Sequence, residues 1–327
     1  MDKLVRLGIL GCADIAYRRF MPAAKQVTKL QVVVVSEEYD KSKLPLFSEE
    51  YGLETIDTFE ALIDRSDIDA IYIPQPPALH YKWAKVALEA GKHVLIEKPS
   101  TTSYQLTKEL VELARERNLA LHENYMFQYH SQIGAIKDMV RNGVIGDVRM
   151  YKANFGFPMR SQNDFRYSKA LGGGALLDAG GYTAKLATLF LGNSIKADAA
   201  QLNYLPDYEV DMYGSATFSN DSGIVCQVGF GMDCSYQCNL EIWGSKGRLY
   251  TNRIFTAPDG YEPTVLIENQ EGNKEIKLDA DSHFKHSIEM FLEEIYNDDA
   301  KADMYEQILL QAKLVDDIRK MGSKEGE

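Results

Sequence analysis

The chain has 327 residues, of which 45% are hydrophobic and 26% are charged, and this length allows about two domains, each with its own core. Its 36 lysines and arginines against 48 aspartates and glutamates give a formal charge of −12, which excludes nucleic acid as the main partner because phosphate binding needs clustered basic residues. No run approaches the roughly 18 apolar residues of a membrane span, and the N-terminus enters a strand pattern without a secretory leader. We therefore expect a cytoplasmic protein that does not bind membranes.

The first part of the chain, residues 1–122, alternates short apolar runs with amphipathic stretches, as β-α-β units of a parallel sheet do. The predicted strands are LVRLGILG, LQVVVVS, AIYIP, HVLIEK and LALHEN. The stretches between them, such as LHYKWAKVALEAG, carry apolar residues at helical spacing. This pattern predicts an α/β fold with a doubly wound parallel sheet.

The first strand runs into GCADIA, residues 11–16, where a dinucleotide-binding (Rossmann) domain carries GxGxxG or GxGxxA. Gly11 and Ala16 fit that pattern, whereas Ala13 replaces the central glycine. Because a helix follows the turn, the helix N-terminus can face a diphosphate. The candidate cofactor residues here are Gly11, Cys12, Ala13, Asp14, Ile15 and Ala16. A tight turn that binds nothing is the alternative.

The second strand ends at Ser36, Glu37 and Glu38, the place where an acidic residue commonly binds the ribose hydroxyls. Ser36 and Glu37 are therefore candidate cofactor residues. Carboxylates here would repel a 2′-phosphate, although Lys41 and Lys43 are close in sequence. We expect NAD or NADP as cofactor, with a lean to NAD. The alternative is that the two glutamates only solvate a loop.

The second part of the chain, residues 123–327, shows an α+β pattern instead. After the helix SQIGAIKDMVRNG, the predicted strands are DVRMYKANFGF, KADAAQLNYL, DMYGSATF, GIVCQVGFGM, CNLEIWGSKGRLYTN and TVLIENQ. Their alternation predicts an open, mostly antiparallel sheet. Two helices, HFKHSIEMFLEEIYND and ADMYEQILLQAKLVDDIRKM, end the chain and are free to pack back on the first domain.

An exposed sheet face formed by GIVCQVGFGM and CNLEIWG would need a cover, so we expect a homodimer or homotetramer. The four cysteines predict free thiols rather than a disulfide framework. A zinc site at Cys234 and Cys238 lacks the second pair or the histidines that a structural site requires. We expect no metal.

Three side chains suit proton-coupled chemistry. HVLIEKP places Lys98 at the carboxyl end of a buried strand, where α/β sheets bind ligands, and GGGALLDAGGY places Asp178 and Tyr182 on one face if it is helical. Hydride transfer to a carbonyl leaves negative charge on oxygen, which must be stabilised and protonated. A lysine beside a tyrosine can do both, because the cation favours ionisation of a phenol whose ordinary pKa is ~10. The alternatives are a surface lysine, a helix cap at Asp178 and a buried aromatic at Tyr182.

Three segments resemble the Gfo/Idh/MocA family of glucose-fructose oxidoreductases and inositol dehydrogenases: GILGCADIA, AIYIPQPPALHYKWAKVALEAGKHVLIEKP and GGGALLDAGGY. The resemblance covers essentially the whole chain, and its most specific element is EKP with the preceding Pro74 and His80. HENYMFQYHSQ and DFRYSKALGGGALLDAGGY are most similar to the branch of NDP-sugar 3-ketoreductases, although dihydrodiol dehydrogenases share the tyrosine. Many inositol-dehydrogenase-like members carry histidine at the position of Tyr182.

This resemblance implies an NAD(P)-dependent oxidoreductase acting on CH–OH groups, which reduces a keto-sugar nucleotide. It implies that Tyr182 donates the proton and that Lys98 stabilises the alkoxide, while Asp178 orients Lys98 or binds a sugar hydroxyl. The alternatives are a dehydrogenase of a free sugar, polyol or dihydrodiol and, in another class, a non-catalytic sensor of sugars or dinucleotides.

The resemblance also implies that Pro74, His80, Glu97 and Lys98 lie near the cofactor, with Glu97 on the nicotinamide side. For His80 the alternative is a polar residue that merely starts a helix. The expected substrate-binding residues are Tyr125, Arg160, Asn163 and Arg166. Arginine suits a diphosphate because its guanidinium contacts two oxygens at once, but FPMRSQNDFRY is equally compatible with a solvated loop.

Overall fold

The structure is a computed structural model that describes residues 4–323. The chain divides into two compact units. One runs to Tyr125 and includes Phe284–Ala312, and the other comprises Met126–His283 and the chain from Lys313 onward. Within the described residues, no helix combines the length and the apolar character needed to cross a membrane.

The first unit contains a six-stranded sheet in the order β3-β2-β1-β4-β5-β6, in which all neighbouring strands are parallel. The strands are β1 (Val5–Leu10), β2 (Leu30–Ser36), β3 (Glu54–Ile56), β4 (Ala70–Ile73), β5 (His93–Glu97) and β6 (Leu121–Asn124). The central strands are almost wholly buried, as expected for a parallel sheet covered on both faces. The predicted doubly wound sheet is confirmed. Its strand order reverses between β1 and β4, which is where such sheets bind ligands.

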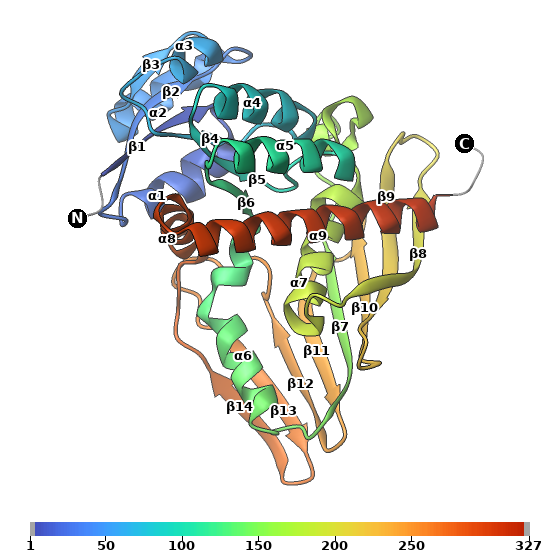
Figure 1. Ribbon diagram of the computed structural model, residues 1–327. Helices are drawn as coiled ribbons and strands as arrows, with labels where there is room; N and C mark the ends of the chain where they lie inside the picture. The colour runs from blue at the N-terminus through green and yellow to red at the C-terminus, as the bar shows by residue number, and fades with distance from the viewer. Residues whose placement is uncertain (1–3, 324–327) are drawn as a thin grey trace. The chain divides into compact units, whose positions relative to one another are not determined.

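The helices of this unit follow the strands along the chain. They are a π-helical turn (Ala16–Phe20), α1 (Met21–Ala24), a 3₁₀ turn (Lys41–Lys43), α2 (Leu44–Tyr51), α3 (Phe59–Ile63), α4 (Pro77–Glu89), α5 (Tyr104–Glu116), α8 (His283–Tyr296) and the first part of α9 (Asp298–Gly322). Helices α4 and α5 lie side by side, and α4 packs against β4 and β5 (Figure 1). The Ser103 hydroxyl caps α5 by accepting the Leu106 amide at 3.4 Å.

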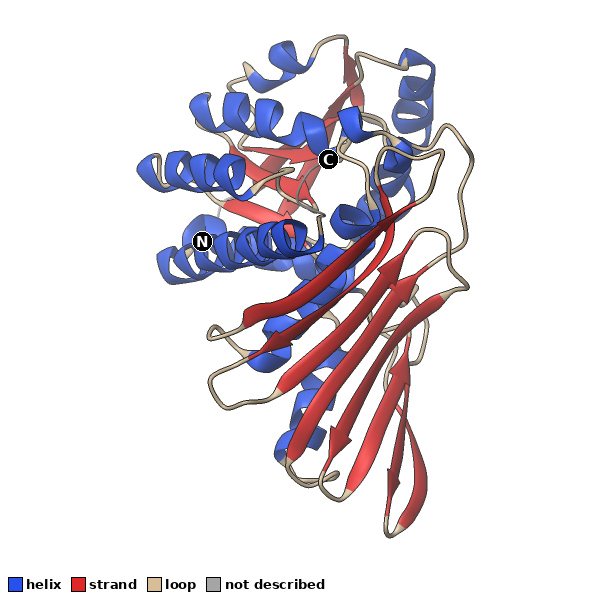
Figure 2. Ribbon diagram, turned by 90° about the vertical axis from the view of Figure 1, so that its right-hand side faces the viewer, coloured by secondary structure: helices blue, strands red, loops and turns tan. Residues whose placement is uncertain are grey.

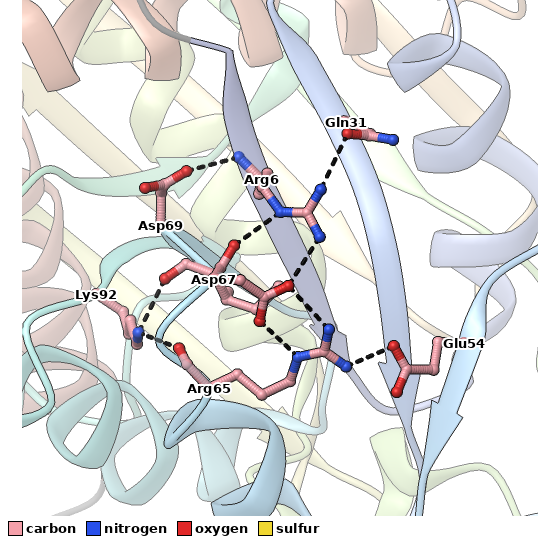
Figure 3. A network of polar contacts seen from close by, with 8 residues as sticks. Arg6, Gln31, Glu54, Arg65, Asp67, Asp69 and Lys92 are labelled. Atoms are coloured by element: carbon pink, nitrogen blue, oxygen red, sulfur yellow. Dashed lines mark hydrogen bonds and ion pairs between the residues drawn. The ribbon is translucent and has the colours of Figure 1, made fainter.

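A network of charged side chains braces the amino ends of the parallel strands (Figure 3). Asp67 bridges two arginines, Arg6 at the start of β1 at 2.8 Å and Arg65 at 2.9 Å, and Arg65 also contacts Glu54 of β3 at 2.6 Å. Lys92, just before β5, donates to the backbone oxygen of Arg65 at 2.6 Å. These contacts lie at the edge of the sheet opposite the carboxyl ends, which leaves the carboxyl edge for ligands.

The second unit contains an eight-stranded sheet in the order β14-β13-β12-β11-β7-β10-β9-β8. Neighbouring strands are antiparallel except β7 and β10, which are parallel. The strands are β7 (Val148–Gly156), β8 (Lys196–Tyr204), β9 (Asp211–Ser219), β10 (Val225–Gly231), β11 (Gln237–Gly244), β12 (Gly247–Asn252), β13 (Thr264–Asn269) and β14 (Gly272–Lys277). The predicted open, mostly antiparallel sheet is confirmed. The short β3 and the polar edge strand β14 were not predicted.

The helices of this unit pack on one side of the sheet. They are α6 (Ser131–Arg141), α7 (Gly181–Leu191), the end of α9, a π-helical turn (Leu176–Gly180) and 3₁₀ turns at Met126–Tyr129, Phe165–Tyr167 and Lys169–Leu171. Helix α7 packs against β7 and β10. Alternate residues of β10, namely Cys226, Val228 and Phe230, are buried.

The other face of this sheet is turned toward the viewer in Figure 2, and none of the described helices of this unit covers it. The register places Trp243, Glu241 and Lys152 on this face, together with Tyr213 and Leu266. Trp243 is 57% exposed. The sequence interpretation of this face therefore needs a correction: most apolar residues of GIVCQVGFGM are buried, and the open face mixes large apolar side chains with polar and charged ones.

Candidate active site

The turn after β1 is shaped so that only glycine fits its first position. Gly11 has a φ of +109°, and its amide donates to the Ser36 oxygen at 2.7 Å. A Cβ on Gly11 would collide with Nε2 of Gln75, which donates to the Leu10 oxygen at 2.6 Å. The carboxyl ends of β1, β2 and β4 are thereby tied together. Gln75 was not predicted as a site residue, although its place shortly after a buried strand, within PQPP, is a usable signal.

A helix begins directly after this turn. The Ala13 oxygen accepts the Tyr17 amide at 3.1 Å, and Ala16–Phe20 continues as a π-helical turn. Asp14 is exposed and forms an ion pair with Arg18 at 3.3 Å. Residues 11–16 thus form a strand-turn-helix whose first helical amides suit a phosphate.

Glu37 braces the turn against the loop that follows β2. Its side chain is buried, and Oε2 accepts the Cys12 amide at 2.7 Å while Oε1 accepts the amides of Tyr39 at 2.8 Å and Asp40 at 3.4 Å. Burial raises the pKa of the Cys12 thiol to about 12, so this cysteine is not a nucleophile. Both Glu37 oxygens are therefore engaged by the protein backbone.

The charged residues after Glu37 have partners that the sequence alone did not indicate. Glu38 accepts the Phe59 amide at the start of α3, at 2.6 Å. Lys41 and Lys43 are about half exposed, and Lys41 forms an ion pair with Asp57 at 3.2 Å. The two glutamates thus anchor backbone, whereas the two lysines face solvent.

The donor set at these strand ends fits a dinucleotide. The turn places the backbone of Gly11, which carries no side chain, next to the start of a helix. The buried Ser36 hydroxyl has no hydrogen-bond partner within residues 4–323. A buried polar group without a protein partner is suited to a ligand. In the same range, no three His, Cys, Asp or Glu side chains are grouped to hold a metal ion.

Lys98 lies at the end of β5 and is partly exposed. The Lys98–Pro99 peptide bond is cis. The preceding Glu97 is buried, and its Oε1 accepts Tyr72 Oη at 2.7 Å and Asn124 Nδ2 at 2.7 Å. Burial raises the pKa of Glu97, and these two donors act in the opposite direction.

His80 connects the ends of β4 and β5. Its Nδ1 lies 2.8 Å from the Pro99 oxygen and its Nε2 lies 2.6 Å from the Gln75 oxygen. Burial lowers the pKa of His80 to about 4, so the ring is neutral and donates to one of these carbonyls. Pro74 is buried beside this bridge at the end of β4.

Tyr182 is buried in the second unit. Its hydroxyl lies 3.6 Å from the Met126 sulfur. Three aromatic rings, with centroids 5.2 to 6.0 Å from its own, surround it: Phe127, Phe155 and Phe255. These aromatic contacts fix the position of the ring.

Asp178 lies in the π-helical turn that runs into α7, and Arg166 holds its carboxylate. Arg166 Nε donates to Asp178 Oδ2 at 2.7 Å, and Nη1 contacts Asp164 Oδ1 at 3.1 Å. Arg166 was predicted as a substrate contact, and the structure pairs it with a predicted catalytic residue. π-Helical turns are frequent at functional sites.

The other predicted substrate-binding residues differ in exposure. Tyr125 is fully buried at the end of the first unit's leading segment. Arg160 and Asn163 are exposed, and the Arg160 guanidinium lies 5.2 Å from the centre of the Phe157 ring.

Asp211 holds the start of the helix that carries Asp178 and Tyr182. Its Oδ2 accepts the Leu176 amide at 2.6 Å, and a Cβ on Gly174 would collide with its Oδ1. Gly174 has a φ of +118°, so both the conformation and the close approach require glycine. Sequence analysis missed Asp211. An acidic residue between two apolar ones, as in VDM, is the signal that could have found it.

Two family models match the chain. Residues 5–125 match an oxidoreductase family with an NAD-binding Rossmann fold, and residues 133–250 match the GFO/IDH/MocA C-terminal domain. The chain belongs to the Gfo/Idh/MocA family of oxidoreductases. The predicted family and its NAD(P)-binding Rossmann domain are confirmed.

The similar enzymes belong to the predicted branch. The chain is 41% identical to the dTDP-3,4-didehydro-2,6-dideoxy-alpha-D-glucose 3-reductase of Actinomadura kijaniata, over 96% of this chain and 95% of that enzyme. It is 38% identical to the enzyme of that name from Saccharopolyspora spinosa, over 99% and 100%. The crystal structure of KijD10, a 3-ketoreductase from Actinomadura kijaniata in complex with NADP and TDP-benzene, matches with a TM-score of 0.93 and 40% identity, over 97% of both chains.

The bound NADP in that structure favours NADP over the lean to NAD drawn from the sequence. The lean to NAD rested on the acidic residues after β2. In the structure both oxygens of Glu37 accept backbone amides, so its charge is directed into the protein. Only coordinates reveal this direction.

The burial of Asp211 gives a prediction about stability. Burial raises the pKa of Asp211 to about 6, above the ~3.9 of an unfolded aspartate, so folding favours its protonated form. The stabilising contribution is present below the unfolded value and is lost as pH rises through about 6. Asp211→Asn keeps an acceptor for the Leu176 amide and removes the charge. We expect the variant to be more stable than wild type at pH 8, by about 3 kcal/mol at most, and equally stable near pH 4.

Chemical denaturation at the two pH values measures this difference. Asp207→Asn, at an exposed aspartate of the same unit, is the control and should show no pH-dependent gain. A variant Asp211→Asn that is less stable than wild type at pH 8 would contradict the interpretation.

Proposed function

We propose that the protein is an NADPH-dependent reductase of a keto-deoxysugar linked to a nucleoside diphosphate. The support comes from full-length similarity to the dTDP-sugar 3-reductases and from the structure of KijD10 with NADP and TDP-benzene. Oxidoreductase activity follows from the family, whereas the sugar nucleotide is the part proposed.

A single observation carries the assignment of the reactive groups. KijD10 has been crystallised with one tyrosine replaced by phenylalanine and with one lysine replaced by alanine. The number of residues that separates that lysine from that tyrosine equals the separation of Lys98 and Tyr182 in this chain. We therefore propose Lys98 and Tyr182 as the catalytic pair.

The dinucleotide, when bound, supplies the hydride. Addition of hydride to the carbonyl carbon turns the C=O double bond into an alkoxide, whose negative charge the Lys98 ammonium stabilises. Tyr182 gives its hydroxyl proton to that oxygen and regains a proton from solvent. Arg166 fixes the carboxylate of Asp178, one helical turn before Tyr182. We propose that Asp178 binds a sugar hydroxyl or orients Lys98.

Other residues are proposed to bind the two ligands. The turn at residues 11–16 and Ser36 would hold the dinucleotide, and Pro74, His80 and Glu97 would support its nicotinamide end. For the substrate, Arg160 suits the diphosphate because it is exposed and its guanidinium can contact two oxygens at once. Asn163 lies in the same segment. Tyr125 is proposed to line the substrate site.

The catalytic pair can be tested by two single substitutions. Tyr182→Phe and Lys98→Met should each lower kcat by about 10²–10⁴-fold, because each removes a group that acts on the oxygen only as charge develops. Cofactor binding should remain. The measurement is the rate of NADPH oxidation with a TDP-linked 3-keto-deoxysugar, followed at 340 nm.

Two comparisons make this test specific. Tyr151→Phe, at a tyrosine that is also buried in the second unit, should retain full activity. The same sugar without its nucleotide should react poorly. Equal rates for both sugars would refute the nucleotide-linked substrate, and unchanged rates in both variants would refute the catalytic assignment.

The choice of cofactor can be tested at the two lysines after β2. Lys41 and Lys43 follow the end of β2 and are exposed, so we propose that they meet the 2′-phosphate of NADPH. Lys43→Gln should raise the Kd of NADPH about five- to tenfold and leave that of NADH unchanged, since about 1 kcal/mol of a charged contact is lost. Fluorescence titration of each reduced cofactor measures this. Lys108→Gln on α5 is the control, and tighter binding of NADH than NADPH by wild type would contradict the assignment.

The assembly of the chain can be tested at the open sheet face. We propose that the open face of the eight-stranded sheet joins copies of the chain into a homodimer or homotetramer, because its exposed Trp243, Tyr213 and Leu266 would otherwise face water. Light scattering after size exclusion should give a mass above that of one chain, and Trp243→Arg should reduce it. Leu46→Arg, on exposed α2, should not. A monomer at micromolar concentration would refute the proposal.

A further inference from the structure

A continuous chain of buried hydrogen bonds leads from Glu97 to α8 within the first unit. Each member is less than a tenth exposed. In order, the members are Tyr72, Glu97, Asn124, Ser287, His122 and Glu294. Neither the family comparison nor the proposed mechanism assigns a role to the last three.

The contacts are short throughout. Asn124 Nδ2 donates to Glu97 Oε1 at 2.7 Å, and Ser287 Oγ donates to Asn124 Oδ1 at 2.7 Å. His122 Nε2 lies 2.9 Å from Ser287 Oγ, and His122 Nδ1 lies 2.8 Å from Glu294 Oε1.

The fold places these side chains in one row. Asn124 is directly opposite Glu97 in the pairing of β5 with β6, and His122 shares its face because alternate strand residues point the same way. Ser287 and Glu294 are seven residues apart on α8, which places them on one face of that helix. Phe291 of α8 packs edge-on against His122, with ring centroids 6.0 Å apart.

The donor and acceptor capacities of these groups fix the direction of each hydrogen bond. A serine hydroxyl has one hydrogen, and Ser287 gives it to Asn124, so its oxygen must accept from His122 and Nε2 must carry a proton. Because the Asn124 oxygen is occupied by Ser287, the amide nitrogen faces Glu97. The carboxylate of Glu97 therefore meets two donors and no competing acceptor on its Oε1.

The far end of the chain needs one further proton. With Nε2 protonated, the contact of His122 Nδ1 with Glu294 requires either an imidazolium beside a carboxylate or a neutral ring beside a carboxylic acid. Both arrangements have zero net charge. Removal of this proton would leave Nε2 as an acceptor, reverse Ser287, and turn the carbonyl of Asn124 toward Glu97.

We propose that His122, Ser287 and Asn124 form a positioning relay that holds Glu97 as a carboxylate beside Lys98. This positioning role adds to the proposed reductase function, and its effect on catalysis rests on that proposed function. An anionic Glu97 places a negative charge next to the Lys98 ammonium, the group proposed to stabilise the alkoxide. A protonated Glu97 lacks that charge.

Polar and charged groups from several elements face the two ends. Glu97 is met by Tyr72 from β4, Asn124 from β6 and Lys98, its neighbour in the chain. Glu294 is met by His122 and lies near Tyr305 of α9, whose hydroxyl donates to the Leu119 oxygen.

The first test needs no activity. With only six histidines in the chain, ¹⁵N-histidine labelling and long-range ¹⁵N–¹H correlation spectra of the wild-type protein can report the protonation of each ring. The relay requires that Nε2 of His122 carries a proton at pH 7.5. An unprotonated Nε2 would overturn the proposed direction whatever the enzyme's substrate is.

The second test uses the variants Ser287→Ala and Ser287→Thr. Loss of the hydroxyl should lower kcat at pH 7.5 about tenfold and move the acid limb of the kcat–pH profile upward by about one pH unit, because the Asn124 amide is no longer held. The KM of the sugar nucleotide and the Kd of NADPH should stay within about twofold. Ser287→Thr keeps a hydroxyl and should restore both kcat and the profile.

The control is Ile288→Val, which trims a buried side chain next to Ser287 on α8. It should leave the pH profile in place. The relay is refuted when Ser287→Ala keeps the wild-type profile, when Ile288→Val shifts it equally, or when Ser287→Thr fails to restore it. An inactive wild type would instead refute the proposed function, and the histidine spectra would still decide the relay.

Discussion

A buried carboxylate needs hydrogen-bond donors, and meeting this need organises the carboxyl edge of the parallel sheet. Glu97 ends β5 and takes one donor from β4 and one from β6. The Ser287 hydroxyl of α8, from the far end of the sequence, donates to the oxygen of the same Asn124 amide. The position of Lys98, one residue later, is therefore set by contacts from several segments and not by β5 alone.

Carboxylates also accept hydrogen bonds from backbone amides at other places that carry predicted site residues. Glu37 accepts the Cys12 amide in the glycine turn, Glu123 accepts the Ser100 amide at 2.8 Å just after Lys98 and Pro99, and Asp211 accepts the Leu176 amide ahead of Tyr182. Each carboxylate replaces a backbone partner that a turn or a helix start cannot supply by itself. Part of the excess of acidic residues thus serves to fix backbone next to the proposed site.

Sequence periodicity was sufficient for most of the fold. Five of the six parallel strands and most of the antiparallel ones were predicted, since burial on one or both faces leaves a clear pattern. β3 and β14 were missed because they are short or polar edge strands that bury little. The resemblance identified the family, which the comparisons confirm.

Side-chain partnerships were less accessible to sequence reasoning. Arg166 and Asp178 were both selected, but for separate roles, and their contact at 2.7 Å depends on how the 3₁₀ and π-helical turns fold. Ser287 and His122 were not selected at all. They are 165 residues apart. His122 begins the quoted run HENYMFQYHSQ, whereas Ser287 lies in a terminal helix outside the segments that carry the resemblance. Polar pairs of this kind become visible only when the packing of α8 against β6 is known.

The cofactor preference shows why residue type alone can mislead. A glutamate after β2 can bind a ribose or anchor its own backbone, and the two uses require opposite side-chain directions. In this chain Glu37 points to the amides of Cys12 and Tyr39, so its charge is offset by backbone dipoles before any ligand arrives. Lys41 and Lys43 are about half exposed, and each forms an ion pair with an aspartate. We propose that these two lysines favour a cofactor with an additional phosphate. In that proposal the buried charge of Glu37 positions the turn, and the exposed lysines contribute to the choice of cofactor.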